Sequence, residues 1–272
     1  MKFLKSIAVT AIAIALGTSA FADEAYDIVK KSTTLEVPDT SQATMMLYNI
    51  EKNGTVEEMP MLQYGREVDG LVNTVFDIKG PAKIKDTRVL QMEKAGRTAD
   101  DRWIYQPKLK QVRRIPMTER YKQFVGCEFT YNDMAIRHVD EDKHEMIENE
   151  VKITVPGGKQ YTCWKIKSTP YKKSDIEYSY RVLYIDKESY LPAMIEYYDK
   201  KDKTKIMKTY TTEAWQYLTS KTGKKYVMRM KARVVNNFTG RQTALEIKNP
   251  IMDAGISPAY FTQQFLSTGK AK

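Results

Sequence analysis

Histidine and cysteine are scarce in this sequence: its 272 residues contain two of each. His138 and His144 are six residues apart, which matches no common metal motif, and acidic residues surround them, so we expect a solvated acidic hairpin. The sequence also has no Gly-x-Ser-x-Gly, His-Glu-x-x-His or glycine-rich phosphate-binding motif. These absences argue against the common hydrolase, metalloprotease and nucleotide-binding classes. We expect no catalytic residue, no metal and no cofactor.

Linkers, repeats and long apolar runs are lacking as well. No Pro/Gly/Ser-rich tract divides the chain, and no fixed period of the kind seen in solenoid proteins recurs. The N-terminus carries Lys2 and Lys5, an apolar run over 7–16 and a small-x-small sequence at 20–22, which together predict a cleavable signal peptide. The run is too short to span a bilayer. We therefore expect a signal peptide over 1–22 and a single exported domain over 23–272.

Positive charge is in excess. The formal net charge is +10, and removal of Lys2 and Lys5 with the signal leaves 10 − 2 = +8. Export and the lack of a recognisable nucleic-acid module argue against nucleic acid as a partner. An anionic membrane surface or an acidic partner is the better target for this charge. A solvated basic surface that only aids solubility is the equal alternative.

The two cysteines, Cys127 and Cys163, belong to a chain that is expected to reach an oxidising compartment. That environment permits one disulfide between them. Both lie in predicted strands with a further strand between, so pairing depends on geometry beyond the sequence. The alternative is two buried thiols that pack as small apolar groups.

Short alternating segments separated by turn residues dominate the mature sequence. Asn53-Gly54 and Asp69-Gly70 are strong hairpin turns. Beyond them, strands are predicted over 88–93, 101–106, 110–115, 127–133, 144–155, 160–168, 177–186, 191–199, 203–212, 224–236 and 240–248. So many strands in one domain must nearly close, and the interior then needs a ligand or a plug. We expect a mainly β fold: an antiparallel, incompletely closed (half) β-barrel with a hydrophobic cavity lidded by short helices, for which 24–35 and 116–123 are the available segments.

The most distinctive stretch is 101–133, an aromatic strand, a basic turn and a second aromatic segment. Candidate residues for binding a ligand, in the cavity or its lid, are Trp103, Tyr105, Arg113, Arg114, Phe129 and Tyr131. The aromatic residues are spaced by two and so share one face of a strand, where packing in the wall is the alternative. Arg113 and Arg114 are adjacent, so in a strand one of them would point inward and need an anionic partner. Two surface arginines beside a turn are the alternative.

This stretch resembles the LolA-like outer-membrane lipoprotein-sorting proteins, in particular the branch associated with membrane-protein exporters. The resemblance rests on Trp-x-Tyr-x-Pro at 103–107, Arg-Arg-Ile at 113–115 and Gly-x-x-Phe-x-Tyr at 126–131, in matching order and spacing. Cys127 and Glu128 replace that branch's serine and aspartate, and Asn132 stands where an acid is common. The hydrogen bonds around these residues are therefore not carried over.

The resemblance implies a half-open β-barrel whose hydrophobic cavity holds acyl chains. It also implies periplasmic transport of lipids or lipoproteins between the inner and outer membranes, without covalent chemistry and with an inner-membrane exporter as partner. Two other classes stay open. One is an interaction protein that docks on a transporter and carries nothing, and the other is a secreted hydrolase that uses carboxylates such as Asp133 and Asp140.

Overall fold

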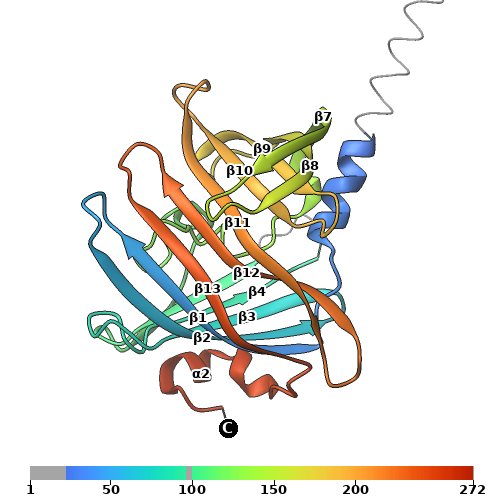
Figure 1. The fold of residues 1–272 in the computed structure, drawn as a ribbon. Coiled ribbons are helices and arrows are strands. Elements are labelled where there is room, and N and C mark those ends of the chain that lie inside the picture. The colour runs from blue at the N-terminus through green and yellow to red at the C-terminus, as the bar shows by residue number, and fades with distance from the viewer. Residues whose placement is uncertain (1–22, 96–99, 272) are drawn as a thin grey trace, which may run out of the picture.

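The computed structural model describes residues 23–95 and 100–271, and the expected signal peptide lies outside these residues. Most of the described chain forms one sheet of thirteen strands (Figure 1). The strands are β1 (Thr40–Ile50), β2 (Val56–Val68), β3 (Leu71–Ile78), β4 (Arg88–Met92), β5 (Asp101–Gln106), β6 (Gln111–Arg114), β7 (Asp142–Thr154), β8 (Gln160–Pro170), β9 (Tyr178–Asp186), β10 (Pro192–Asp199), β11 (Ile206–Thr219), β12 (Lys225–Asn236) and β13 (Gln242–Met252). No helix in the described part is long and apolar enough to cross a membrane.

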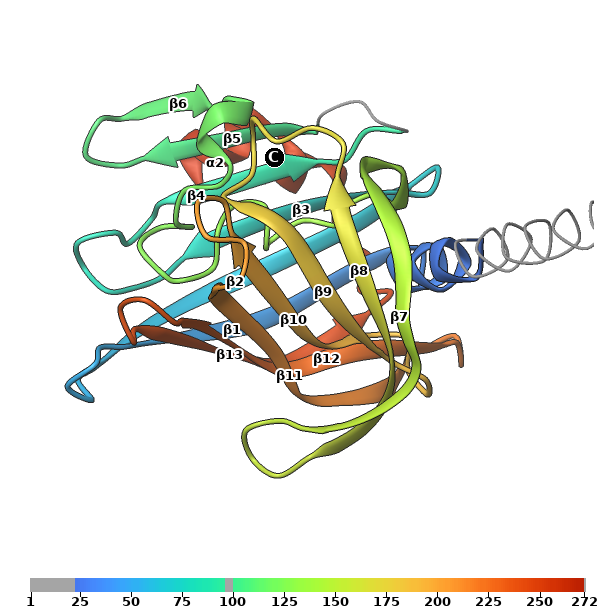
Figure 2. The same cartoon turned by 90° about the horizontal axis from the view of Figure 1, so that it is seen from above.

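The order of the strands explains why the sheet stays open. It runs β6-β5-β4-β3-β2-β1-β13-β12-β11-β10-β9-β8-β7, with every neighbouring pair antiparallel. The two edge strands, β6 and β7, are consecutive in sequence but do not pair with each other. The sheet curves between them and forms a concave face (Figure 2). The prediction of a mainly β, antiparallel and incompletely closed barrel is confirmed.

Buried and partly buried residues alternate along the strands, and the buried set shows which side chains face the core. In β1, Ala43, Met45 and Leu47 are buried, whereas Thr44 and Met46 between them are only partly so. Successive side chains of a strand point to opposite faces, so one set enters the core and the other faces outward. The hairpin that follows β1 turns at Gly54, which has a φ of 87°, a value that L-residues rarely adopt.

Residues 115–141, here called the plug, link the two edge strands and cover the concave face. The plug supplies Ile115, Phe124 and Tyr131 to the main core cluster. Phe124 makes edge contacts with Phe76 of β3, at 5.2 Å between ring centroids, and with Tyr131, at 5.5 Å. Because β6 and β7 lie at opposite edges, the segment that joins them has to cross the opening. The expected lid at 116–123 is part of this longer segment.

The predicted strand at 127–133 is wrong. These residues form turns inside the plug, with an isolated bridge between Gln123 and Thr130. Val125 and Gly126 have φ values of 43° and 91°, which break an extended conformation just before the aromatic residues. Residues 127–131 are all buried, and the spacing of Phe129 and Tyr131 within this irregular segment gave the same sequence pattern as a strand.

A helix over residues 23–33 is the second cover of the concave face, as expected. Its Ala25, Ile28 and Val29 belong to the same core cluster as the plug. These three residues recur at helical spacing, so one side of the helix faces the core. The opposite face of the sheet is covered by η3 (Pro258–Phe261) and α2 (Gln263–Thr268), whose Phe265 and Leu266 are buried beside β2–β4 (Figure 1).

Cys127 and Cys163 are free, buried thiols, so of the two alternatives the structure has the unpaired one and not the possible disulfide. Cys127 lies in the main core cluster with the plug, whereas Cys163 of β8 lies in a separate cluster. The two side chains therefore occupy different parts of the core. Burial raises the pKa of both thiols, that of Cys163 to about 12.

We expect thiol-directed labelling to distinguish this arrangement from a disulfide. At pH 8 the native protein should react slowly, with Cys163 roughly 1,000-fold slower than a free thiol because so little thiolate is present. In denaturant without reductant, both thiols should react at once. The measurement is the number of labels per chain by intact mass, and zero labels in denaturant would contradict the free thiols.

Candidate ligand-binding cavity

A cavity of about 540 Å³ lies between the N-terminal helix, the plug and strands β9–β12. This volume falls in the range of about 300–1,000 Å³ that is typical of small-molecule sites. Its apolar and aromatic lining comes from Val29, Leu35, Val37, Met117, Ala135, Ile136, Tyr171, Tyr178, Leu183, Leu191, Pro192, Ile195, Tyr197, Tyr210 and Val227. Its charged lining comes from Glu36, Asp100, Arg102, Arg120, Asp133, Arg137, Asp140, Glu141, Lys172, Asp175, Arg181 and Arg229.

One group of charges joins the end of the plug to the sheet. Asp142, whose side chain is buried at the start of β7, accepts hydrogen bonds from Arg137 Nη2 and Arg181 Nη2, each at 2.7 Å. Burial alone would raise the pKa of Asp142, but Arg181 and Arg137 outweigh it and hold that pKa below its usual range. These charges compensate one another at the edge of the cavity, and their attraction offsets the cost of removing them from water.

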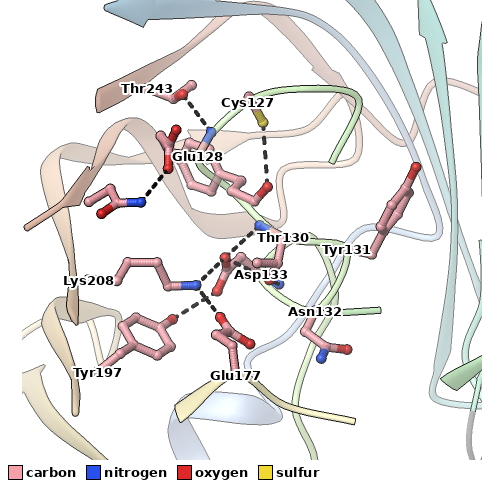
Figure 3. Close-up of polar contacts among 12 residues, drawn as sticks. Cys127, Glu128, Thr130, Tyr131, Asn132, Asp133, Glu177, Tyr197, Lys208 and Thr243 are labelled. Carbon is pink, nitrogen blue, oxygen red and sulfur yellow. Dashed lines mark hydrogen bonds and ion pairs between the residues drawn. The ribbon is translucent and has the colours of Figure 1, made fainter. Parts of the chain in front are cut away.

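A second buried group fixes the middle of the plug (Figure 3). Lys208 Nζ of β11 lies 2.8 Å from Asp133 Oδ2 and 2.6 Å from Glu177 Oε1. Asp133 also accepts hydrogen bonds from the Tyr197 hydroxyl, at 3.0 Å, and from the backbone N–H and hydroxyl of Thr130, at 2.7 and 2.8 Å. These contacts hold Asp133 as an anion that fixes the plug to β10 and β11.

The plug is bonded to both halves of the sheet. Toward β12 and β13, the carboxylate of Glu128 accepts from Asn236 Nδ2 at 3.1 Å and its backbone N–H donates to Thr243 Oγ1 at 2.9 Å (Figure 3). Toward β5, Arg102 Nη1 donates to the Tyr131 carbonyl at 2.7 Å and to Asn132 Oδ1 at 3.2 Å. Glu128 and Asn132, two departures from the expected motif, therefore hold the plug in place.

Comparison with known proteins places this arrangement in a family. A family model described as "Uncharacterized protein" matches residues 70–268, more than half of the chain. The chain belongs to this family. No curated protein matches the chain.

Solved structures of similar fold agree with the LolA-like resemblance. A DUF1329 family protein from Desulfovibrio piger has a TM-score of 0.78 at 23% identity, and the match covers 90% of this chain and 99% of that one. A putative outer membrane lipoprotein-sorting protein domain from Vibrio parahaemolyticus has a TM-score of 0.77 at 24% identity, with the same coverage. A LolA superfamily protein from Nitrosomonas europaea has a TM-score of 0.61 at 14% identity, covering 89% of this chain and 98% of that one. The fold of this family member is LolA-like.

Within this LolA-like fold, the six candidate residues lie outside the lining of the large cavity. Trp103 and Tyr105 of β5 are half-buried on the outer face, in the cluster around Phe265. The inward side chains of that strand are the buried residues Arg102 and Ile104, because alternate residues face opposite ways. The aromatic pair therefore marks the opposite face of the strand from the cavity.

The arginine pair and the second aromatic pair have different surroundings. Arg113 and Arg114 are exposed and form ion pairs with Glu119, at 2.9 Å, and with Asp101. Arg113 is paired with the inward residue Ile104 and so lies on the inward face, but β6 is a four-residue edge strand, and both arginines stay exposed. Phe129 and Tyr131 are buried in the plug, where they belong to the main core cluster.

The histidines correct one further expectation. His144 is buried rather than solvated, with Nδ1 2.8 Å from Ser168 Oγ and Nε2 2.9 Å from the Val139 carbonyl. Burial lowers its pKa, so it stays neutral near pH 7. His138 Nε2 lies 3.7 Å from Glu93 Oε1. Within the described residues, no group of three or more His, Cys, Asp and Glu side chains is placed to hold a metal ion.

Sequence reasoning missed the charged residues that do line the cavity or hold its cover. Arg181 is followed by five buried residues of β9, and Lys208 is a buried lysine inside a strand. A charge within an otherwise buried strand is costly unless it is paired, so such a residue is a signal of a buried polar network. That signal was present in the sequence, but its partners were not identifiable from local spacing.

Proposed function

We propose that this protein is a non-enzymatic periplasmic carrier that holds acyl chains of lipids or lipoproteins and transports them between the inner and outer membranes. The observation that carries the proposal is the cavity of about 540 Å³ on the concave face of an open sheet, covered by the plug and the N-terminal helix. The likeness in fold to a putative lipoprotein-sorting domain supports it. The predicted signal peptide supports export.

The chemistry of the lining suits an acyl chain. Leu183, Ile195 and Val227 offer apolar surface on three different strands. Each buried methylene contributes about 0.8 kcal/mol, so burial of even half an acyl chain retains the ligand strongly. Release then requires the cover to move or a partner to receive the chain. An inner-membrane exporter and an acceptor at the membrane surface are the partners that such a carrier needs.

A bulky side chain inside the cavity should block binding. We expect Ile195→Trp to weaken the binding of a fluorescent acyl probe at least about tenfold, because displacement of two methylenes costs about 1.6 kcal/mol. Ile195 is buried and lines the cavity, whereas Ile251 of β13 is 45% exposed and does not. Ile251→Trp is therefore the matched control and should bind as the parent does.

The cargo itself is tested on protein purified from the periplasm. Native mass spectrometry and lipid extraction should find a copurified lipid or lipoprotein chain. A protein that is empty and also fails to bind acyl probes would contradict the carrier function, and would favour an interaction protein without cargo. Equal probe binding by the Ile195→Trp variant and its parent would remove the cavity from the proposal.

A further inference from the structure

Five arginines line the cavity, and they differ in how their charge is compensated. They are Arg102, Arg120, Arg137, Arg181 and Arg229. Arg102 forms an ion pair with Asp100 at 3.1 Å. Arg137 and Arg181 both form ion pairs with Asp142. Arg120 and Arg229 form no ion pair with any residue of the described chain. The positive charge of one of these two arginines is therefore available to be balanced by an anion of the ligand.

Arg120 is the more deeply buried of the two. It is 4% exposed, donates from Nη2 to the Asp100 carbonyl oxygen, and has no partner for Nε among the described residues. Burial, and then the neighbouring Arg102 guanidinium, lower its pKa. Asp100 and Asp175 attract it, but neither carboxylate lies within ion-pair distance of it. A buried guanidinium with this surplus of donors is costly unless an anion completes its hydrogen bonds.

Arg229 also lacks a partner for its Nε in the described chain, but the outer end of its guanidinium has one. Its Nη1 donates to the Tyr210 hydroxyl at 2.7 Å, and its guanidinium lies 5.4 Å from the centroid of that ring. It is also only partly buried, so water supplies part of its solvation. A phenol and an aromatic face stabilise a cation without a carboxylate. Arg229 therefore has less need of a ligand anion than Arg120.

Arg120 also has a distinctive position. Together with Met117 it lines both the large cavity and a second pocket of about 400 Å³, whose other lining residues are Arg114, Ile115 and Pro116. Arg120 thus lies where the mixed, partly apolar cavity meets a pocket beside the edge strand β6. A ligand whose chain fills the cavity would place its head group at this junction.

We infer that Arg120 binds the anionic head group, a carboxylate or a phosphate, of the amphiphile whose chain occupies the cavity. This inference rests on the proposed carrier function. Arginine suits the role because its planar fork of donors matches the geometry of both anions. Nη1 makes no hydrogen bond in the described chain and is the donor that the head group would take, because Nε has almost no surface accessible from the cavity.

The test compares ligands that share a chain and differ in head group. We expect the parent protein to bind dodecanoate and dodecyl phosphate about tenfold more tightly than dodecanol, the range for a charge-assisted hydrogen bond. Arg120→Gln should reduce this preference to less than about twofold and leave dodecanol binding unchanged. Arg114→Gln and Arg229→Gln, which each change one cavity or pocket arginine, should keep the preference.

The outcomes separate the inference from the function on which it rests. Equal affinity of the parent for dodecanoate and dodecanol would overturn the head-group site while leaving the carrier in place, whether or not the Arg120 variant folds. Failure to bind any of the three chains would overturn the carrier. Loss of the preference in Arg229→Gln instead of Arg120→Gln would overturn the assignment to Arg120. Inorganic phosphate that binds alone, as tightly as dodecyl phosphate, would show a site for free anions and overturn the head-group role.

Discussion

Replacement of Lys208 by methionine is expected to lower the free energy of unfolding by about 3–5 kcal/mol, the cost of removing one partner from a buried ion pair. Lys208 is buried and holds both Asp133 and Glu177. Methionine fills a similar volume but leaves two buried carboxylates without a cation. Denaturant unfolding of parent and variant at pH 7 measures the loss. Lys205→Met is the control, because Lys205 is exposed and its pair with the exposed Asp202 is worth less than about 1 kcal/mol.

The pH dependence of this loss has a defined sign. In the parent, Lys208 and the hydrogen bonds to Asp133 outweigh burial and lower the pKa of Asp133. This carboxylate therefore contributes stability above its unfolded pKa of about 3.9, and the contribution disappears as the pH falls through the lower folded pKa. In Lys208→Met the same buried carboxylate lacks a cation, so its pKa rises. Protonation then removes the cost of an unpaired buried charge and stabilises the variant. The stability difference should shrink from pH 7 to pH 4, and a constant difference would contradict the role of Asp133.

Strand pattern and turn chemistry were enough to predict the architecture. The predicted strand over 101–106 coincides with β5, and the Asn53-Gly54 turn joins β1 to β2. These signals are local: alternation reports one buried face, and a glycine at positive φ reports a tight turn. Near closure followed from the number of strands. The prediction could not say where the opening lies, since that depends on which strands remain unpaired.

The plug was harder to predict because its core residues are irregular in conformation. Phe129 and Tyr131 alternate as they would in a strand, yet they are buried by contacts from both halves of the sheet. Local spacing cannot distinguish these two causes of burial. The same limit applies to β5, where Trp103 and Arg102 face opposite ways and only tertiary packing decides which side is the cavity.

The polar network around the cavity depends on contacts that are distant in sequence. Asp142 meets Arg181 across 39 positions, and Asp133 meets Lys208 across 75. No pattern of neighbouring residues specifies such pairs. Arg113 and Arg114 were candidate ligand-binding residues because two adjacent charges in a strand face opposite sides. On a short edge strand, however, both remain exposed. A charge beside a run of buried residues in a strand, such as Arg181, is the better guide to a site inside a β-barrel.

Asp142→Asn should have the second large effect on stability. Asp142 is the anion shared by Arg137 and Arg181, and an amide cannot compensate their charge. Arg137 keeps a second carboxylate, Glu141, at 3.0 Å, whereas Arg181 keeps, among the described residues, only its contact with the ring of Tyr178. We therefore expect a loss of about 3 kcal/mol in the free energy of unfolding, at the lower end of the range for a broken buried pair.

Acid titration makes the Asp142 prediction specific to its charge. The pKa of Asp142 is lowered by its two arginines against the effect of burial, so its contribution is present above the unfolded pKa and is lost as the pH falls through the folded pKa. The Asp142→Asn variant lacks this titration, so its unfolding free energy should fall less steeply than that of the parent below about pH 4. Asp140→Asn, two residues away on an exposed carboxylate bonded to Tyr26, is the control and should keep the parental slope. Equal slopes for all three proteins would mean that Asp142 does not act as the anion that joins the plug to the sheet.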